Sequence, residues 1–208
     1  MPTATTRPYR GVSADQRRAD RRERLLEAGL DLFGSQGWSA TTVRGVCARA
    51  GLTERYFYES FKDREALLLA VFDEIIGEAT RVVLEAVATA PHDEREKSRA
   101  AIAAFVDLMT DDPRKGRIAF VEAMGSEPLM LRRLETLRAF AQLIADQAQA
   151  FYGRSAVSRA DAELTALVLV GGLAETLIAW LGGSLPLSRD RLVDHVANLF
   201  VAASSVRS

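Results

Sequence analysis

Apolar residues recur at helical spacing along almost the whole chain, and this periodicity constrains the fold more than any other feature. In residues 15–36, for example, Leu25, Ala28, Leu32 and Phe33 follow the i, i+3, i+7, i+8 pattern of one buried helix face. No clear alternating strand pattern is evident, and only six of the 208 residues are proline. The sequence therefore predicts an all-α fold of about nine helices.

Charge is distributed unevenly between the two ends of the chain. The net charge is −1, with 48% apolar and 26% charged residues, as in ordinary soluble globular proteins. Residues 1–64 carry 12 Lys/Arg and 8 Asp/Glu, whereas residues 65–208 carry 15 and 20. We therefore expect only the basic N-terminal part to face an anionic partner.

The single cysteine limits the chemistry that the chain can support. Cys47 alone excludes an internal disulfide and a CxxC metal site, so we expect no metal and no cofactor. Cys47 falls on the inner face of its predicted helix and is expected to be a small core residue. The N-terminus has no apolar leader segment, and the expected location is the cytoplasm.

Residues 41–67 predict two short helices joined by a tight turn. Thr41 is expected to cap the first helix, which ends at Gly51, and Thr53 to cap the second. Asp63 is then the expected cap of a long helix that runs to about Thr89. Such a pair of helices at a steep angle is typical of a helix-turn-helix that reads DNA. The simpler alternative is a packed helical hairpin.

The same stretch resembles the TetR family of bacterial repressors. The match covers about residues 20–70, and the residues that carry it are Thr42, Arg44, Ala50, Gly51, Leu52, Thr53, Phe57, Tyr58, Phe61 and Asp63. Gly45, Ser60 and Arg64 depart from the residues most frequent in the family at these positions. The resemblance implies a DNA-binding transcriptional regulator with a C-terminal domain that binds a ligand and forms a homodimer.

The predicted second helix of the motif would lie in the major groove. Phe57 and Phe61 should face inward. The residues expected to read bases are Arg44, Thr53, Glu54, Arg55 and Tyr56. The residues expected to hold phosphate are Thr42, Tyr58, Lys62 and Arg64, a role that the resemblance implies most firmly for Tyr58 and Arg64.

Three regions follow from these patterns. Residues 1–14 are predicted to be a disordered arm, which would either touch DNA or be inert. Residues 15–66 are the predicted DNA-binding domain. Residues 67–208 are the predicted ligand-sensing and dimerisation domain.

Residues 164–181 contain one charge, Glu175, in an otherwise strongly apolar helix. Its length is just enough for a membrane span, but Glu175 and two threonines interrupt it, so no membrane partner is expected. A helix that is apolar on nearly all sides is buried on all sides, here against its own domain and a second copy. The expected dimer interface comprises Leu167, Val170, Gly171 and Leu177, with Leu192, Val196, Leu199 and Phe200 of the last helix.

Large apolar side chains of the C-terminal part are candidates for an effector cavity. They are Phe105, Met109, Phe120, Met124, Phe140, Phe151 and Trp180, with Glu175 and Thr176 as polar groups. Each apolar residue could equally fill the core. His92 is expected to be a solvated loop residue. A ligand that favours the form unable to bind DNA would release the operator.

Other functions remain to be weighed against this prediction. The sequence contains no GxGxxG, P-loop, GxSxG or HExxH motif, so no catalytic residue and no enzyme activity are expected. A helical ligand-binding adaptor without DNA binding is a second possibility. The choice between repressor and activator stays open. The expected partners are a double-stranded DNA operator, an apolar effector and a second copy of the chain.

Overall fold

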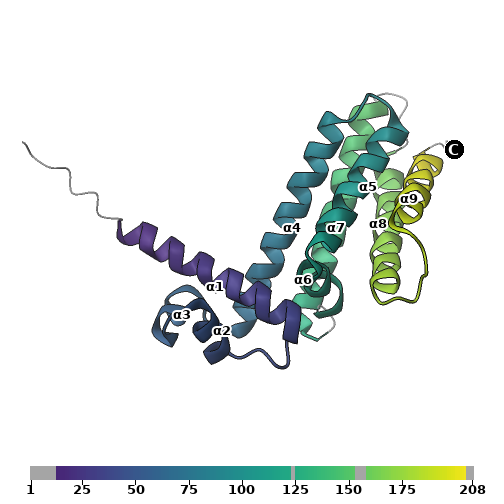
Figure 1. Cartoon of the computed structure of the whole chain (residues 1–208). Coiled ribbons are helices and arrows are strands. Elements are labelled where there is room, and N and C mark those ends of the chain that lie inside the picture. The colour runs from purple at the N-terminus through teal and green to yellow at the C-terminus, as the bar shows by residue number, and fades with distance from the viewer. Residues whose placement is uncertain (1–12, 123–124, 153–157, 205–208) are drawn as a thin grey trace, which may run out of the picture.

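The computed structural model describes residues 13–122, 125–152 and 158–204, and every regular element among them is helical (Figure 1). The α-helices are α1 (Ala14–Gln36), α2 (Val43–Ala50), α3 (Glu54–Ser60), α4 (Arg64–Thr89), α5 (Glu94–Asp111), α6 (Pro113–Gly116), α7 (Glu127–Tyr152), α8 (Arg159–Leu181) and α9 (Arg189–Ser204). A single π-helical turn, η1 (Arg117–Val121), follows α6. The prediction of an all-α fold is confirmed, and the arm expected over residues 1–14 lies almost wholly outside the described residues.

Helices α1, α2 and α3 pack around the first turns of α4 and form the N-terminal unit (Figure 1). Their shared core contains Leu25, Phe33, Val46, Phe57 and Leu67, each fully buried. Phe61 is 6% exposed, and the prediction that both phenylalanines face inward is confirmed. Because each of these short helices buries one apolar stripe, the unit is held by tertiary packing more than by helix propensity.

Of two helix caps predicted from the sequence, one is found in the structure and the other is not. The Asp63 carboxylate accepts the Ala66 N–H at 2.7 Å, which confirms it as the cap of α4. The expectation that Thr41 caps α2 is wrong. Thr42 is the cap, since its hydroxyl oxygen accepts the Gly45 N–H at 3.0 Å. Thr41 is buried, and its hydroxyl donates to the Gly37 carbonyl at 2.8 Å.

Helix α4 joins the two ends of the molecule. Its first half buries Leu68, Val71, Phe72 and Ile75, and Figure 1 shows that it runs from the N-terminal unit to the far end of the C-terminal bundle. Helices α5, α7, α8 and α9 complete that bundle, where α5 packs against α4 and α9, and α7 packs against α8. A displacement in the bundle can therefore reach the N-terminal unit along one rigid element.

Capping residues set the helices between α4 and α7. Helix α5 begins at Glu94, because the Asp93 carboxylate accepts the Glu96 N–H at 2.9 Å and caps it. The four-residue α6 follows, capped by Asp112 with Pro113 in its first turn, and it leads into η1. Met124 lies outside the described residues.

By length and composition, α8 is the one helix of the described chain that could cross a membrane, but only 17% of its most apolar window is buried in the single chain. Its inner face, with Ala166, Ala174 and Leu177, packs into the bundle. The opposite face exposes Leu164 and Val168, at 63% and 66%. One apolar face of α8 is thus left uncovered by its own subunit.

Candidate DNA-binding surface and ligand cavity

Helix α3 presents one continuous polar face to solvent. The exposed residues there are Thr53, Glu54, Arg55, Tyr56 and Tyr58, and Arg44 of α2 is exposed as well. The Thr53 hydroxyl makes no capping hydrogen bond and is free to contact a ligand. All five side chains expected to read bases therefore lie at the surface, four of them around the start of α3 and Arg44 in the first turn of α2.

Two arginines of α1 contact α3 and the turn that precedes it, and these contacts hold the orientation of α3. Arg24 donates to the carbonyls of Ala50 and Gly51 in the turn between α2 and α3. Gly51 has a φ of 64°, a left-handed conformation that glycine adopts without steric cost, and a Cβ there would lie 2.9 Å from Arg24. The Arg21 guanidinium stacks 4.5 Å from the ring centroid of Tyr56. The turn and the reading face are therefore held in one geometry.

Arg55 is a strongly exposed cation of this face. Its side chain is 85% exposed, and Nε donates to the Glu59 carboxylate one helical turn away at 3.3 Å. An exposed pair of this kind contributes less than about 1 kcal/mol. Arg55 can therefore leave Glu59 at small cost and make two hydrogen bonds to guanine.

The four residues expected to hold phosphate differ in their surroundings. Tyr58 and Lys62 are exposed, and Thr42 is exposed at the start of α2. Arg64 is partly buried. Its guanidinium lies 3.8 Å from the ring centroid of Trp38 and donates to the Thr41 carbonyl. Arg64 thus anchors the loop before α2, and its contact with phosphate stays a prediction.

The C-terminal bundle contains a partly open cavity of about 640 Å³. Helices α4, α5, α7, α8 and α9 contribute to its wall together with η1. Phe105 lines the cavity, and its ring centroid lies 6.4 Å from that of Phe120 and 6.1 Å from that of Phe140. Such a volume and such an apolar lining are typical of a site for a small organic ligand.

Polar and charged side chains line the cavity at several places, and they include Glu94, Gln147, Gln149, Asp161 and Thr165. Arg133 and Thr136 project from the first half of α7. His92, Lys97 and Ser98 lie near the junction of α4 and α5, at the end of the bundle farthest from α1–α3 in Figure 1. His92 is exposed but stacks on Phe151 with ring centroids 4.8 Å apart, so its description as a solvated loop residue was incomplete.

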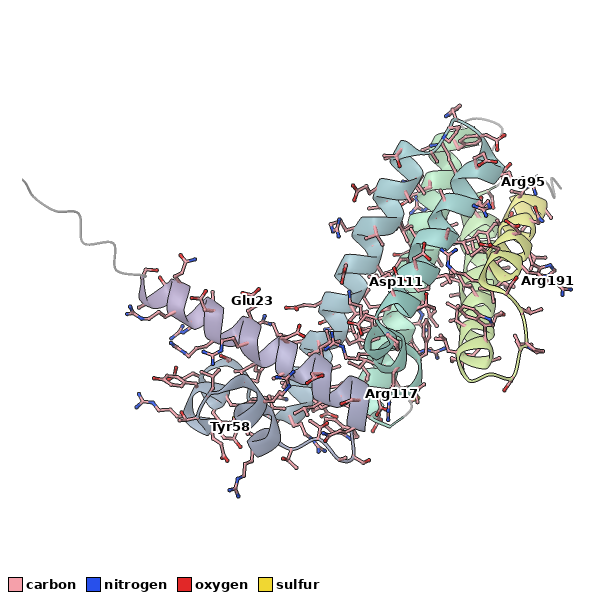
Figure 2. The ribbon with its side chains drawn as sticks, viewed as in Figure 1. Glu23, Tyr58, Arg95, Asp111, Arg117 and Arg191 are labelled. Carbon is pink, nitrogen blue, oxygen red and sulfur yellow. The ribbon has the colours of Figure 1, made fainter. Side chains whose placement is uncertain are left out.

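The wall of the cavity continues into the junction with α1. Phe120 of η1 lines the cavity, and Glu122, which follows η1, is 8% exposed. Glu122 accepts the Trp38 backbone N–H at 2.7 Å and the Arg117 Nε–H at 2.9 Å. Arg117 also donates to the Ser35 carbonyl at 2.9 Å, and Figure 2 shows it where α1 meets the bundle. These contacts tie η1 to the end of α1.

A second set of contacts joins α6 to α1. Gly34 packs so closely that a Cβ there would lie 2.4 Å from that of Arg114. Arg114 binds Asp112 at 2.8 Å and Asp31 of α1 at 3.5 Å. The hydrogen bond from Arg114 lowers the pKa of Asp112. Asp31 also has a lowered pKa, chiefly through its hydrogen bond with Arg49 and secondarily through Arg114.

Comparison with known proteins agrees with this architecture. Residues 25–71 match the family model described as bacterial regulatory proteins, tetR family. The transcriptional regulator BetI of Paraburkholderia xenovorans is 32% identical over 170 residues, which are 79% of this chain and 82% of BetI.

This chain belongs to the TetR family. It is therefore a DNA-binding transcriptional regulator, in a family that is not enzymatic.

Other TetR-family relatives differ in their described roles. The transcriptional activator FasR of Mycolicibacterium smegmatis is 26% identical over 178 residues, covering 85% of this chain and 80% of FasR. The crystal structure of the regulator FadR from Bacillus subtilis, in complex with stearoyl-CoA, has the same fold with a TM-score of 0.73. It is 18% identical and covers 87% of this chain and 98% of FadR.

Several residues expected in the TetR-type effector site lie elsewhere. Phe105, Met109, Phe120, Phe140 and Phe151 line the cavity. Glu175, Thr176 and Trp180 do not. The Glu175 side chain is 68% exposed, the Thr176 hydroxyl donates to the Gly172 carbonyl, and the indole N–H of Trp180 donates to Leu187 at 2.9 Å. All three lie on the second half of α8, beyond the part that lines the cavity.

The expected dimer residues are also divided by the structure. Leu177, Leu192 and Val196 are buried inside the subunit, so they cannot face a partner and that prediction is wrong. Val170 and Phe200 are partly buried and line the cavity. Leu167, Gly171 and Leu199 remain accessible. The sequence showed that α8 is apolar all round, but the direction of each face depends on its neighbours.

Sequence analysis missed Arg133, Lys97 and the junction residues Arg117 and Glu122. The sequence pattern did indicate that Arg133 belongs to the inner face of its helix, because Arg133, Leu137 and Phe140 are spaced at i, i+4 and i+7. The junction contacts span more than 80 residues along the chain. No local pattern indicates such a contact.

Proposed function

We propose that this TetR-family regulator is a ligand-responsive repressor. It binds a pseudo-palindromic operator as a homodimer and leaves the operator when an apolar small molecule enters the C-terminal cavity. The observation that carries this proposal is the position of η1, which lines the cavity through Phe120 and is adjacent to Glu122, the residue bonded to the end of α1. Action on an operator would take place in the bacterial cytoplasm.

The uncovered face of α8 supports the proposed dimer. Leu164, Val168 and Gly171 follow each other at helical spacing on this face, and a Cβ built on Gly171 or Gly172 meets nothing within 4 Å. On α9, Leu199 is 48% exposed. Pairing of these helices about a two-fold axis would form a four-helix interface. Two copies of α3 would then face successive major grooves.

The cavity supports an apolar effector. Its lining is mainly aliphatic and aromatic, and burial of apolar ligand surface there would contribute about 25 cal/mol per Å². The structural relative FadR binds stearoyl-CoA, a ligand with a long apolar chain. A chemically similar apolar chain is compatible with this cavity.

The coupling between effector and operator requires differential binding. A ligand shifts the equilibrium only if it prefers one conformation. We propose that a ligand packed against Phe120 displaces η1 and, through Glu122 and Trp38, changes the angle between α1 and the bundle. That change would alter the separation of the two reading helices and lower operator affinity.

Selection of bound duplexes from a random DNA pool tests the DNA-binding part. Replacing Arg55 with alanine should relax preference at one base-pair position, at a cost of about 1–3 kcal/mol. Replacing Lys62 with alanine should weaken all sequences equally and reduce the salt slope by about one. Selection of the same motif with equal stringency by Arg55→Ala would refute the assignment of α3 as the reader.

An activator is the second candidate function, because the relative FasR is described as an activator. Transcription in vitro from a promoter that carries the selected operator distinguishes the two. Repression predicts less transcript on addition of the protein and recovery with effector. A protein-dependent increase in transcript would instead support activation.

A further inference from the structure

Arg133 is a partly buried cation in the cavity wall. Its side chain is 18% exposed and belongs to the cavity lining. Its NH2 group donates to Glu175 Oε1 at 2.8 Å, and this is its one polar contact among the residues that the structure describes. A guanidinium has five N–H donors. No buried side-chain nitrogen among the described residues lacks a hydrogen-bond partner, so the N–H groups of Arg133 that Glu175 does not engage are accessible to an acceptor that enters the cavity.

Within the described part of the chain, Glu175 supplies the acceptor that Arg133 contacts. Leu137 and Phe140 flank it on α7, and Leu173 and Ala174 line the same cavity from α8. The other side chain with a full positive charge in the described lining is Lys97, whose ammonium donates to the Val87 carbonyl at 3.1 Å. Arg133 is therefore the cation best placed to meet a charged group inside the cavity.

The present partner of Arg133 is easily displaced. The Glu175 side chain is 68% exposed and lies on the outward face of α8. Its carboxylate would regain hydration on release, and a pair with one solvated partner contributes little stability. A carboxylate inside the cavity, by contrast, would bind the guanidinium through two parallel charge-assisted hydrogen bonds, which are stronger than bonds between neutral groups.

We propose that the effector is an apolar molecule with a single carboxylate, which binds Arg133 in place of Glu175 while its hydrocarbon part packs against Phe105 and Phe140. This inference rests on the proposed effector function and names the chemical class of the ligand. The planar, two-donor fork of arginine selects a carboxylate over a neutral hydroxyl or a cationic head. Arg133 is thus the residue that determines head-group specificity.

Isothermal titration of the full-length protein with three probes of equal chain length tests the proposal. The probes are decanoate, decanol and decyltrimethylammonium, used below their aggregation concentrations. Decanoate should bind at least about tenfold more tightly than decanol, and the cation should bind most weakly. Arg133→Gln should abolish the preference for decanoate over decanol and leave decanol binding nearly unchanged.

Two further variants separate the head-group contact from general effects on folding. Glu175→Gln removes the competing carboxylate and should tighten decanoate binding several-fold without affecting decanol. Arg138→Gln is the matched control, because Arg138 is exposed on the same helix and does not line the cavity. It should leave all three affinities unchanged. If Arg133→Gln fails to fold, Arg133→Lys keeps the charge but not the fork, and should lose part of the preference.

Equal affinity of the wild type for decanoate and decanol would overturn the proposal. A decanoate preference that persists in Arg133→Gln, or the absence of binding by any probe, would do the same. Affinity for the selected DNA duplex, measured on the same preparations, distinguishes a failure of the head-group assignment from a failure of the proposed effector function. Decanoate binding through Arg133 with no change in DNA affinity would support the head-group assignment and refute the proposed effector function.

Discussion

Replacement of Glu122 tests the link between the cavity wall and the N-terminal unit. Its carboxylate accepts two hydrogen bonds, from the Trp38 backbone N–H at 2.7 Å and from Arg117 Nε at 2.9 Å. Trp38 in turn lies under the Arg64 guanidinium, which donates to the carbonyl of Thr41 before α2. Glu122→Ala removes the central acceptor of this series.

The expected loss of stability follows from the exposure of each partner. A hydrogen bond to a charged acceptor contributes about 1.5–3 kcal/mol, and we assign this range to the partly buried Trp38 N–H. The Arg117 side chain is 39% exposed, so water can replace most of its contact with the Glu122 carboxylate. Loss of that contact should therefore cost only about 0–1 kcal/mol of stability. Glu122→Ala should therefore lower the free energy of unfolding by about 1.5–4 kcal/mol. Glu122→Gln keeps a neutral acceptor and should cost about 1 kcal/mol.

Urea unfolding of the two variants measures these values. Glu23→Ala is the matched control, because Glu23 is exposed on α1 (Figure 2), and its effect should stay within about 0.5 kcal/mol. Operator affinity should fall in Glu122→Ala, since the orientation of α1 is less restricted. An effector should also reduce the remaining affinity less than it does in the wild type.

An unfolding midpoint and slope of Glu122→Ala equal to those of the wild type would refute the stability argument. It would mean that water satisfies the Trp38 N–H as well as the carboxylate does. A destabilised variant with undiminished coupling between effector and operator would refute the proposed route instead, and would direct attention to α4 as the connecting element.

Three further predictions concern other parts of the chain. Val168→Arg places a charge on the uncovered face of α8 and should convert dimers to monomers in sedimentation experiments with the helix content retained; an unchanged mass would contradict the proposed interface. Arg114→Gln should cost about 1 kcal/mol near neutral pH. Arg114 lowers the pKa of Asp112 and contributes to the lowered pKa of Asp31. The stabilisation of the folded protein by these pairs is therefore fully present above 3.8, the pKa of an aspartate in the unfolded chain. It is lost as the pH falls through the lower pKa values of the two aspartates in the folded protein. The difference between the two proteins in urea unfolding should therefore shrink below that pH, and a constant difference would exclude this linkage. Burial raises the pKa of the Cys47 thiol, with a smaller contribution from Glu54, so a thiol reagent should react with it in urea and hardly at all in the folded protein.

Sequence by itself determined the features that depend on neighbouring residues. The helix-turn-helix was predictable because Gly51, the Asp63 cap and the inward pair Phe57 and Phe61 act within one or two turns of chain. Helical periodicity gave the fold class for the same reason. The error at Thr41 and Thr42 is small, since either hydroxyl could cap α2 and only the path of the preceding loop chooses between them.

Tertiary structure alone decided which apolar residues line the cavity, which pack in the core and which face outward. Leu177 and Leu164 both belong to α8 and have similar side chains, yet the first is buried and the second is 63% exposed. The neighbours α7 and α9 make this difference, and their contacts arise far along the chain. The same holds for the pairing of Arg133 with Glu175 and for the contact of Glu122 with Trp38. Helical periodicity specifies that a face is apolar, but the element that covers it is set by the packing of the whole chain.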